Sequence, residues 1–143
     1  MKDGTKRLLI FNVQERRYAL GLQDVAEVME PPPTFPIPRA PGWFKGVMNF
    51  HGSLVSVLDL AKFLKIGSAV RPGKVLVLDR CIASLALMVD RVETIVSDDN
   101  VLGEVAGSEP MVAKVLNTAD GEVKLLAVEA LLAELEETMN REV

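Results

Sequence analysis

The sequence has little of what metal sites, disulfides and nucleotide sites require. Its 143 residues include one histidine, His51, and one cysteine, Cys81. One residue of each kind cannot provide paired His ligands, a cysteine cluster or an intramolecular disulfide. Neither GxGxxG nor GxxxxGK[ST] follows any apolar run, so the usual phosphate-binding loops are missing. We therefore expect no metal and no cofactor.

Long apolar runs are also missing. The chain is 49% hydrophobic and 25% charged, and its apolar stretches are all interrupted well before 18 residues. The opening segment MKDGTKRLLIFNV places basic residues before an apolar run, but the run is short and no small-residue cleavage site follows it. These features predict a cytoplasmic globular protein without direct membrane insertion.

Basic residues are too few and too dispersed for an evident nucleic-acid site. The isoelectric point is about 5.1 and no dense basic stripe is present. A cut after Val75 leaves 11 Lys/Arg against 6 Asp/Glu in the first part and 5 against 14 in the second. If the two parts form separate lobes, the protein is an electrostatic dipole, which steers partners. We expect no nucleic-acid partner; a small-barrel nucleic-acid binder is kept as a remote alternative.

The residues that suggest nucleophilic catalysis do not form a convincing set. His51 and Ser53 flank a predicted turn, and no third group that would orient them is evident. Cys81 follows Asp79-Arg80 at a predicted turn, where a packed or tolerated thiol is the expected state. We expect no catalytic residue and no enzyme activity. For His51 two interpretations stay open: a residue that tolerates positive φ in the turn, or an imidazole exposed to a partner.

Short strand patterns recur along the chain and predict small barrels or sandwiches. The expected strands are 8–13, 18–22, 47–50, 54–58, 74–78, 85–89, 91–96, 112–116 and 123–127. The strands at 47–50 and 54–58 predict a hairpin with about three connecting residues, followed by an Asp59 helix cap and a left-handed Gly67. Residues 128–139 predict an amphipathic helix. The Pro-rich segment 31–41 cannot be a central strand.

Internal similarity predicts a duplication. YALGLQDVAEVM (18–29) aligns with LALMVDRVETIV (85–96) at an offset of 67 residues. Residues 47–49 align with 115–117 at an offset of 68, and Leu58-Asp59 with Val128-Glu129 at 70. We therefore expect a single domain, residues 1–143, made of two copies of a small β unit. Each copy takes roughly one half of the chain, with strand exchange possible.

The motifs taken together resemble the CheW-like family, the coupling proteins of bacterial chemosensory arrays. The matching strings occur in the family's order over nearly the whole chain. They are LLIFNV, YALGLQDVAEV with its V-x-E-[IV] motif, PRAPGWFKGVMNFHGSLVSVLDL with its GV-x-N-x-x-G hairpin, MVDRVETI, and GEVKLLAVEALL.

The resemblance implies a mainly β fold of two SH3-like five-stranded barrel lobes, with short helices and a C-terminal helix. It implies a non-enzymatic adaptor that couples the cytoplasmic tip of chemoreceptors to the regulatory domain of the CheA histidine kinase. Residues matched to the family's receptor-contact positions are candidates for that role. They are Val25, Glu27, Thr34, Phe35, Gly46, His51 and Val89.

One residue departs from the family pattern. The hairpin turn usually reads N-x-R-G, and this chain has His51 at the Arg position. Arginine carries a permanent charge and a fork of donors, whereas histidine is shorter and neutral over much of the physiological pH range. An alternative therefore stays open: a CheW-like scaffold that pairs with kinase regulatory domains in a non-flagellar pathway, with altered or lost receptor binding.

Overall fold

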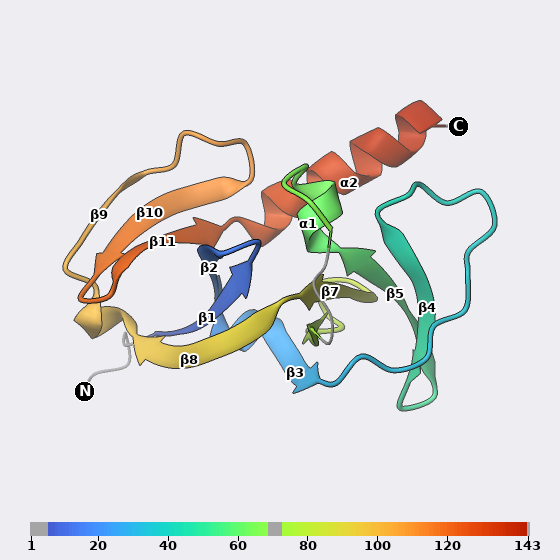
Figure 1. The fold of residues 1–143 in the computed structure, drawn as a ribbon, viewed down its shortest axis with the longest axis horizontal. Coiled ribbons are helices and arrows are strands. Elements are labelled where there is room, and N and C mark those ends of the chain that lie inside the picture. Colours follow the sequence, from blue (N-terminus) through green and yellow to red (C-terminus); the bar gives the residue numbers. More distant parts are fainter. Residues whose placement is uncertain (1–5, 69–72, 143) are drawn as a thin grey trace. The chain divides into compact units, whose positions relative to one another are not determined.

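The protein is built mainly from β-strands arranged in two sheets (Figure 1). The computed structural model describes residues 6–68 and 73–142. Contacts between Cα atoms divide the chain into two compact units. Unit 1 consists of Met1–Phe11, Arg16–Leu22 and Glu93–Val143, and unit 2 of Asn12–Glu15 and Gln23–Val92.

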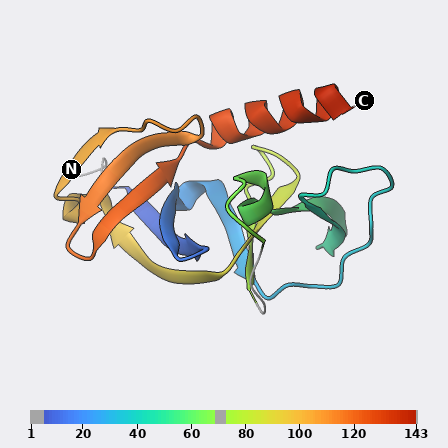
Figure 2. The same cartoon turned by 45° about the horizontal axis from the view of Figure 1, so that its top comes forward.

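Unit 1 is centred on a six-stranded sheet with the strand order β8-β1-β2-β11-β10-β9. Its core includes Leu8, Ile10, Ala19, Leu116 and Val123, which lie on four of these strands. Figure 2 shows β9, β10 and β11 as neighbours within the sheet. The strands are β1 (Arg7–Val13), β2 (Arg16–Gly21), β8 (Arg91–Ser97), β9 (Gly103–Ala106), β10 (Val112–Thr118) and β11 (Gly121–Leu126); the helices are η2 (Asp98–Asn100) and α2 (Val128–Glu142).

Unit 2 is centred on a five-stranded sheet with the strand order β3-β6-β7-β5-β4. Its core includes Met48, Val55, Val57, Val77 and Met88, against which Met29 and Phe50 pack. The strands are β3 (Val25–Met29), β4 (Phe44–Phe50), β5 (Ser53–Asp59), β6 (Lys74–Leu78) and β7 (Leu85–Val89); the helix α1 is Leu60–Phe63, and the 3-10 helix η1 (Leu22–Asp24) precedes β3.

The two sheets have the same order of strands, as the predicted duplication requires. The order β3-β6-β7-β5-β4 of unit 2 corresponds strand by strand to β8-β1-β2-β11-β10 of unit 1. Unit 1 has one extra strand, β9. In both sheets the third and fourth of these strands pair in parallel: Ser56 with Leu85 and Lys124 with Tyr18. The mainly β, duplicated SH3-like fold is confirmed, although the ladders form open sheets of five and six strands rather than closed five-stranded barrels.

The register of the ladders tests two of the three predicted alignments. Val47 pairs with Ser56, and Val115 pairs with Lys124, which confirms the offset of 68 between β4 and β10. The same register makes Leu58-Asp59 equivalent to Leu126-Ala127, so the predicted match to Val128-Glu129 is wrong by two residues. The predicted match paired Asp59 with Glu129 because both are acidic, whereas the backbone position equivalent to Asp59 is Ala127. In both units the helix begins directly after the equivalent pair.

The strand arrangement also corrects the predicted charge asymmetry. β1 and β2 lie in the sheet of β8 to β11, and their basic residues therefore belong to the acidic unit. Unit 1 contains 8 Lys/Arg and 13 Asp/Glu, and unit 2 contains 8 and 7. The difference between the units is smaller than a cut after Val75 suggests.

Most predicted elements are confirmed, with local corrections. The Asp59 carboxylate caps α1 by accepting the Lys62 N–H at 3.2 Å, and the amphipathic α2 extends to Glu142. The connection between β4 and β5 has two residues rather than three. The first left-handed residue after α1 is Lys65 (φ 64°), ahead of Gly67.

β3 and β9 were not among the predicted strands. None of the described helices combines the length and apolar character that a membrane span requires.

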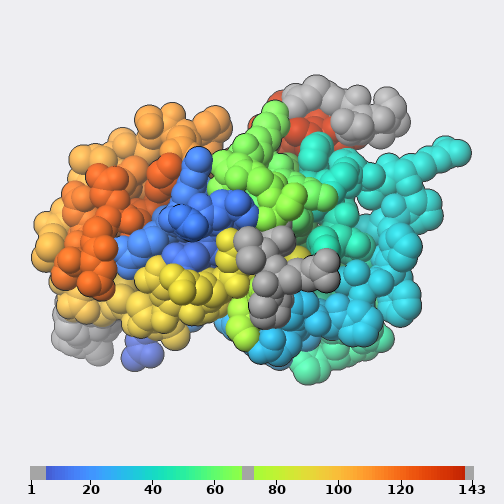
Figure 3. All heavy atoms as spheres, in the orientation of Figure 1, coloured from blue at the N-terminus to red at the C-terminus, as the bar shows by residue number. Residues whose placement is uncertain are grey.

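The Pro-rich segment of unit 2 occupies the position that β9 has in unit 1. β9 pairs with β10 over four residues, whereas the segment makes one bridge to β4, between Phe35 and Val47. Their N–H groups donate to each other's carbonyls at 2.8 and 2.7 Å. Proline lacks an N–H donor, so Pro33, two residues before Phe35, cannot donate the next hydrogen bond to β4. Figure 3 shows this part of the chain (cyan) at the surface.

The bridge depends on Gly46, which has a φ of +143°. A Cβ at this position would lie 2.5 Å from the Phe35 carbonyl oxygen, a backbone atom that cannot move aside cheaply. We predict that Gly46→Ala lowers the free energy of unfolding by about 2 kcal/mol or more, from combined steric and φ strain. Urea unfolding followed by circular dichroism measures the change. Gly42→Ala is the matched control, because nothing lies within 4 Å of its added Cβ; equal stability of the two variants would contradict the prediction.

Candidate functional site

All seven predicted receptor-contact residues belong to unit 2, although they are spread over 65 positions from Val25 to Val89. They are not equally accessible. Glu27, Phe35 and His51 are exposed, Val25 and Thr34 are half-buried, and the other two are buried. The exposed members lie near the two edge strands of the sheet, β3 and β4.

The structure brings together Glu27 and His51, which are 24 positions apart in the sequence. The His51 Nε2 atom lies 3.3 Å from the Glu27 Oε1 atom, with 72% of the His51 side chain and 43% of the Glu27 side chain exposed. Glu27 comes from β3 and His51 from the turn between β4 and β5, so the contact connects the two edges of the sheet. A contact as exposed as this contributes little to stability. It does bring the carboxylate and the imidazole together at the surface.

The turn at His51-Gly52 explains why the imidazole points to solvent. Both residues have positive φ, 51° and 87°, as a two-residue hairpin turn of type I′ requires. The Gly52 N–H donates to the Asn49 side-chain oxygen at 2.9 Å, and the His51 ring lies 4.3 Å from the Phe50 ring. His51 therefore fits both sequence-based interpretations, since it has a left-handed backbone and an exposed side chain.

A second exposed feature lies on the outer face of β4 and β5. Val47 of β4 pairs with Ser56 of β5 on one side and with Phe35 on the other. Leu54 of β5 is the diagonal neighbour of Val47 on the same face of the sheet. Phe35 is 64% and Leu54 70% exposed. We call Phe35, Val47 and Leu54 the hairpin patch. Leu54 was missed by the sequence analysis, which treated it as one more apolar strand residue.

Two candidates are corrected by their burial. Val89, at the end of β7, is completely buried, so its side chain is not a surface contact. The alternation of β7 could not reveal this, because all five of its residues are buried. Gly46 is buried as well, and its observed role is to admit the Phe35 backbone. Thr34 lies beside the same glycine, with its Cβ 3.2 Å from the position of an added Cβ.

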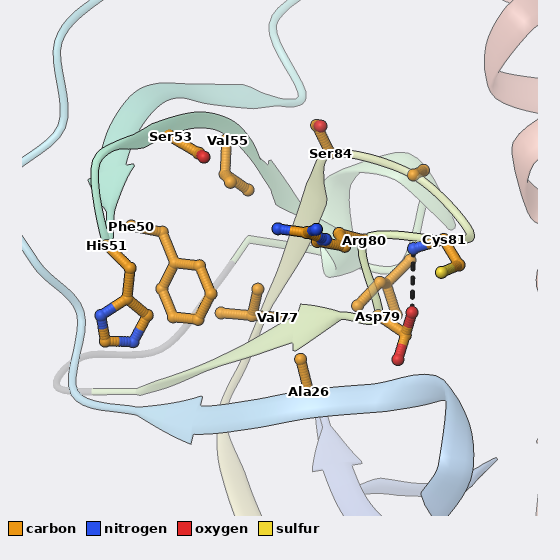
Figure 4. A pocket seen from close by; sticks show the side chains of 12 residues that line it. Ala26, Phe50, His51, Ser53, Val55, Val77, Asp79, Arg80, Cys81 and Ser84 are labelled. Atoms are coloured by element: carbon orange, nitrogen blue, oxygen red, sulfur yellow. Dashed lines mark hydrogen bonds between the residues drawn. The ribbon is translucent and has the colours of Figure 1, made fainter.

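A cavity of about 650 Å³ opens next to the Glu27–His51 pair (Figure 4). Phe50, Val55 and Val77 supply apolar surface, and the loop after β6 supplies polar groups. Among the residues that the structure describes, no group of three or more His, Cys, Asp or Glu could hold a metal ion. The complete lining is Ala26, Phe50, His51, Ser53, Val55, Val77, Leu78, Asp79, Arg80, Cys81, Ala83 and Ser84.

The chemistry of this surface suits recognition. His51 contacts the Glu27 carboxylate and the Phe50 ring. The exposed apolar side chains, the acid–imidazole pair and the open cavity together resemble the mixture of anchors and polar groups found at protein interfaces.

Comparison with known proteins identifies the family to which these features belong. A family model described as "CheW-like domain" matches residues 7–136. The chain is 26% identical over 105 residues to "Chemotaxis protein CheW" of Rhizobium meliloti (strain 1021), an alignment that covers 71% of this chain and 68% of that protein. It is 28% identical over 86 residues to "Chemotaxis protein CheW" of Thermotoga maritima, covering 59% of this chain and 57% of the relative.

A solved structure supports the fold. The scaffolding protein TtCheW from Thermoanaerobacter tengcongensis superimposes with a TM-score of 0.75 at 22% sequence identity, covering 85% of this chain and 88% of that one. At this identity the likeness concerns the fold alone.

The backbone and side-chain roles of His51 can be separated by substitution. We predict that His51→Asn changes the free energy of unfolding by less than about 0.5 kcal/mol, because Asn-Gly is a preferred type I′ pair. His51→Val should cost about 1 kcal/mol or more, since a β-branched residue is strained at positive φ. Thermal unfolding of both variants checks this, and a His51→Val protein as stable as the wild type would contradict the turn assignment.

Proposed function

Because the chain belongs to the CheW-like domain family, we propose that it is a non-enzymatic adaptor that couples chemoreceptors to the CheA histidine kinase in a bacterial chemosensory array. The partners are the cytoplasmic tip of a chemoreceptor and the regulatory domain of the kinase. This assignment places the protein in the cytoplasm, where both partners present these parts.

The observation that carries the proposal is the convergence of two family motifs on one surface. Val25 and Glu27 come from the V-x-E motif, and His51 comes from the N-x-x-G turn. The 3.3 Å contact between Glu27 and His51 makes one continuous surface of them. A carboxylate and an imidazole beside half-buried apolar residues can bind a polar helix that carries apolar anchors, as a receptor tip is expected to be.

The kinase contact is proposed for exposed apolar residues at the edge of the other sheet. Leu102, directly before β9, is 75% exposed, and Val105, within β9, is 59% exposed. Residues this exposed on an edge strand fit a contact with another barrel, because a small apolar patch there is otherwise costly in water. The proposal thus gives the receptor a surface on unit 2 and the kinase a surface on unit 1.

His51 supports a second candidate function. Its imidazole is paired with Glu27 and cannot make the bidentate contact that an Arg makes with a carboxylate. A CheW-like scaffold that pairs with kinase regulatory domains in a non-flagellar pathway, with altered or lost receptor binding, has this property. Binding of the kinase domain without binding of the receptor tip would favour it.

Purified protein titrated separately with a CheA regulatory domain and with a receptor-tip fragment tests the proposal. We predict that Glu27→Lys weakens binding to the receptor tip at least about tenfold and leaves binding to the kinase domain unchanged, because it reverses a charge on the proposed receptor surface. Isothermal titration calorimetry measures both affinities.

Glu122→Lys is the matched control, since Glu122 is an exposed glutamate on β11 of unit 1. It should leave the affinity for the receptor tip within about twofold of the wild type, because Glu122 belongs to unit 1 and not to the proposed receptor surface of unit 2. Failure of the wild-type protein to bind the kinase domain would refute the adaptor function. Equal losses in the two variants would refute the assignment of the receptor surface to β3.

A further inference from the structure

The cavity beside the hairpin turn contains a guanidinium that the fold does not use. Arg80 is exposed, and among the residues that the structure describes its guanidinium has no hydrogen bond or ion pair. Figure 4 places this group among the lining side chains, on the side of Asp79 and Cys81 that faces the centre of the cavity. An arginine held over a cavity without an acidic partner is available to an anionic group.

Two other polar side chains of the cavity wall, Asp79 and His51, already have partners. An Asp79 carboxylate oxygen accepts the Cys81 N–H at 2.8 Å, which turns the acid toward its own loop. His51 is paired with Glu27. Arg80 is therefore the permanent charge that the described lining residues offer to a ligand.

Part of the cavity wall is apolar. Phe50 is half-buried, and Val55 and Val77 belong to the buried core of unit 2. The volume of about 650 Å³ exceeds that of one large side chain. The ligand expected to bind most tightly combines an apolar group, placed against Phe50, with a carboxylate within reach of Arg80.

The exposure of the rim favours a protein as the source of that ligand. Six of the twelve lining residues are exposed: Ala26, His51, Ser53, Arg80, Cys81 and Ser84. A free metabolite would stay largely hydrated in so open a site, whereas a partner protein covers the rim with its own surface and excludes water. The ligand group then arrives as a side chain on a larger contact.

We propose that this cavity binds an acidic-apolar segment of the receptor partner, with an apolar side chain against Phe50 and a carboxylate paired with Arg80. The identity of the partner rests on the receptor coupling proposed above, because the cavity shares His51 with that surface.

The chemistry of the cavity is tested with 4-phenylbutanoate, which joins an aromatic ring to a carboxylate. Titration of the full-length protein followed by amide NMR should shift the resonances of Phe50, Val55 and Val77. Arg80→Gln should weaken this binding about tenfold, and 4-phenylbutanamide should bind as weakly to the wild type, since both changes remove one charge-assisted contact. Arg39→Gln, at another exposed arginine of unit 2, should have no effect.

The partner is tested with a receptor-tip fragment and a CheA regulatory domain. Arg80→Gln should weaken binding to the tip about tenfold without affecting the kinase domain, and Arg39→Gln should leave both affinities unchanged. Loss of kinase binding alone would overturn the assignment to the receptor. Equal binding of the amide and the carboxylate would overturn the role of Arg80. If phenylbutanoate binds through Arg80 but neither protein binds, the adaptor function fails and the ligand chemistry of the cavity stands.

Discussion

The candidate surface depends on the two-residue turn between β4 and β5. A turn of this length fixes the register of the hairpin, and a slip of one residue would exchange the inner and outer faces of both strands. With the observed register Met48 and Val55 lie in the core of unit 2, whereas Val47 and Leu54 lie on the outer face. The same turn holds His51 within 3.3 Å of Glu27. The core, the hairpin patch and the acid–imidazole pair thus follow from one local constraint.

The Pro-rich segment has a protective role that its composition alone does not reveal. A β-strand at the edge of a sheet presents free N–H and C=O groups that can pair with another chain. In unit 2 the segment covers the middle of β4 through Phe35, and its prolines cannot continue the ladder outward. Unit 1 has the strand β9 at the equivalent place, with exposed Val105 as its edge residue. The two copies of the fold have therefore acquired different edges, as expected if they contact different partners.

The fold could be predicted from the sequence to the extent that its signals are local. Alternating or apolar runs gave nine of the strands, the acidic Asp59 gave the cap of α1, and the spacing of leucines gave α2. β3 and β9 were missed because most of their residues are exposed, so neither has an alternating buried face. The offset between the repeats could be found only where identical residues mark it. Leu58-Asp59 was matched to Val128-Glu129 by side-chain type, whereas the register of the ladders makes it equivalent to Leu126-Ala127.

The site was less predictable, because it depends on residues that are distant in the sequence. The motifs pointed to Glu27 and His51 separately, but nothing in their spacing indicated that their side chains meet. The cavity and the place of the Arg80 guanidinium in it have no sequence signature at all. For Val89, the family pattern suggested a surface contact, whereas its side chain is buried in this chain.

The central claim is that one surface of unit 2 binds the receptor. It is tested most directly by mapping amide chemical shifts of the whole protein during titration with a receptor-tip fragment. We predict that the largest shifts occur in β3, in the hairpin of β4 and β5, and in the loop of residues 79–84. Shifts confined to β9, β10 and β11, with none near Glu27 or His51, would contradict the account.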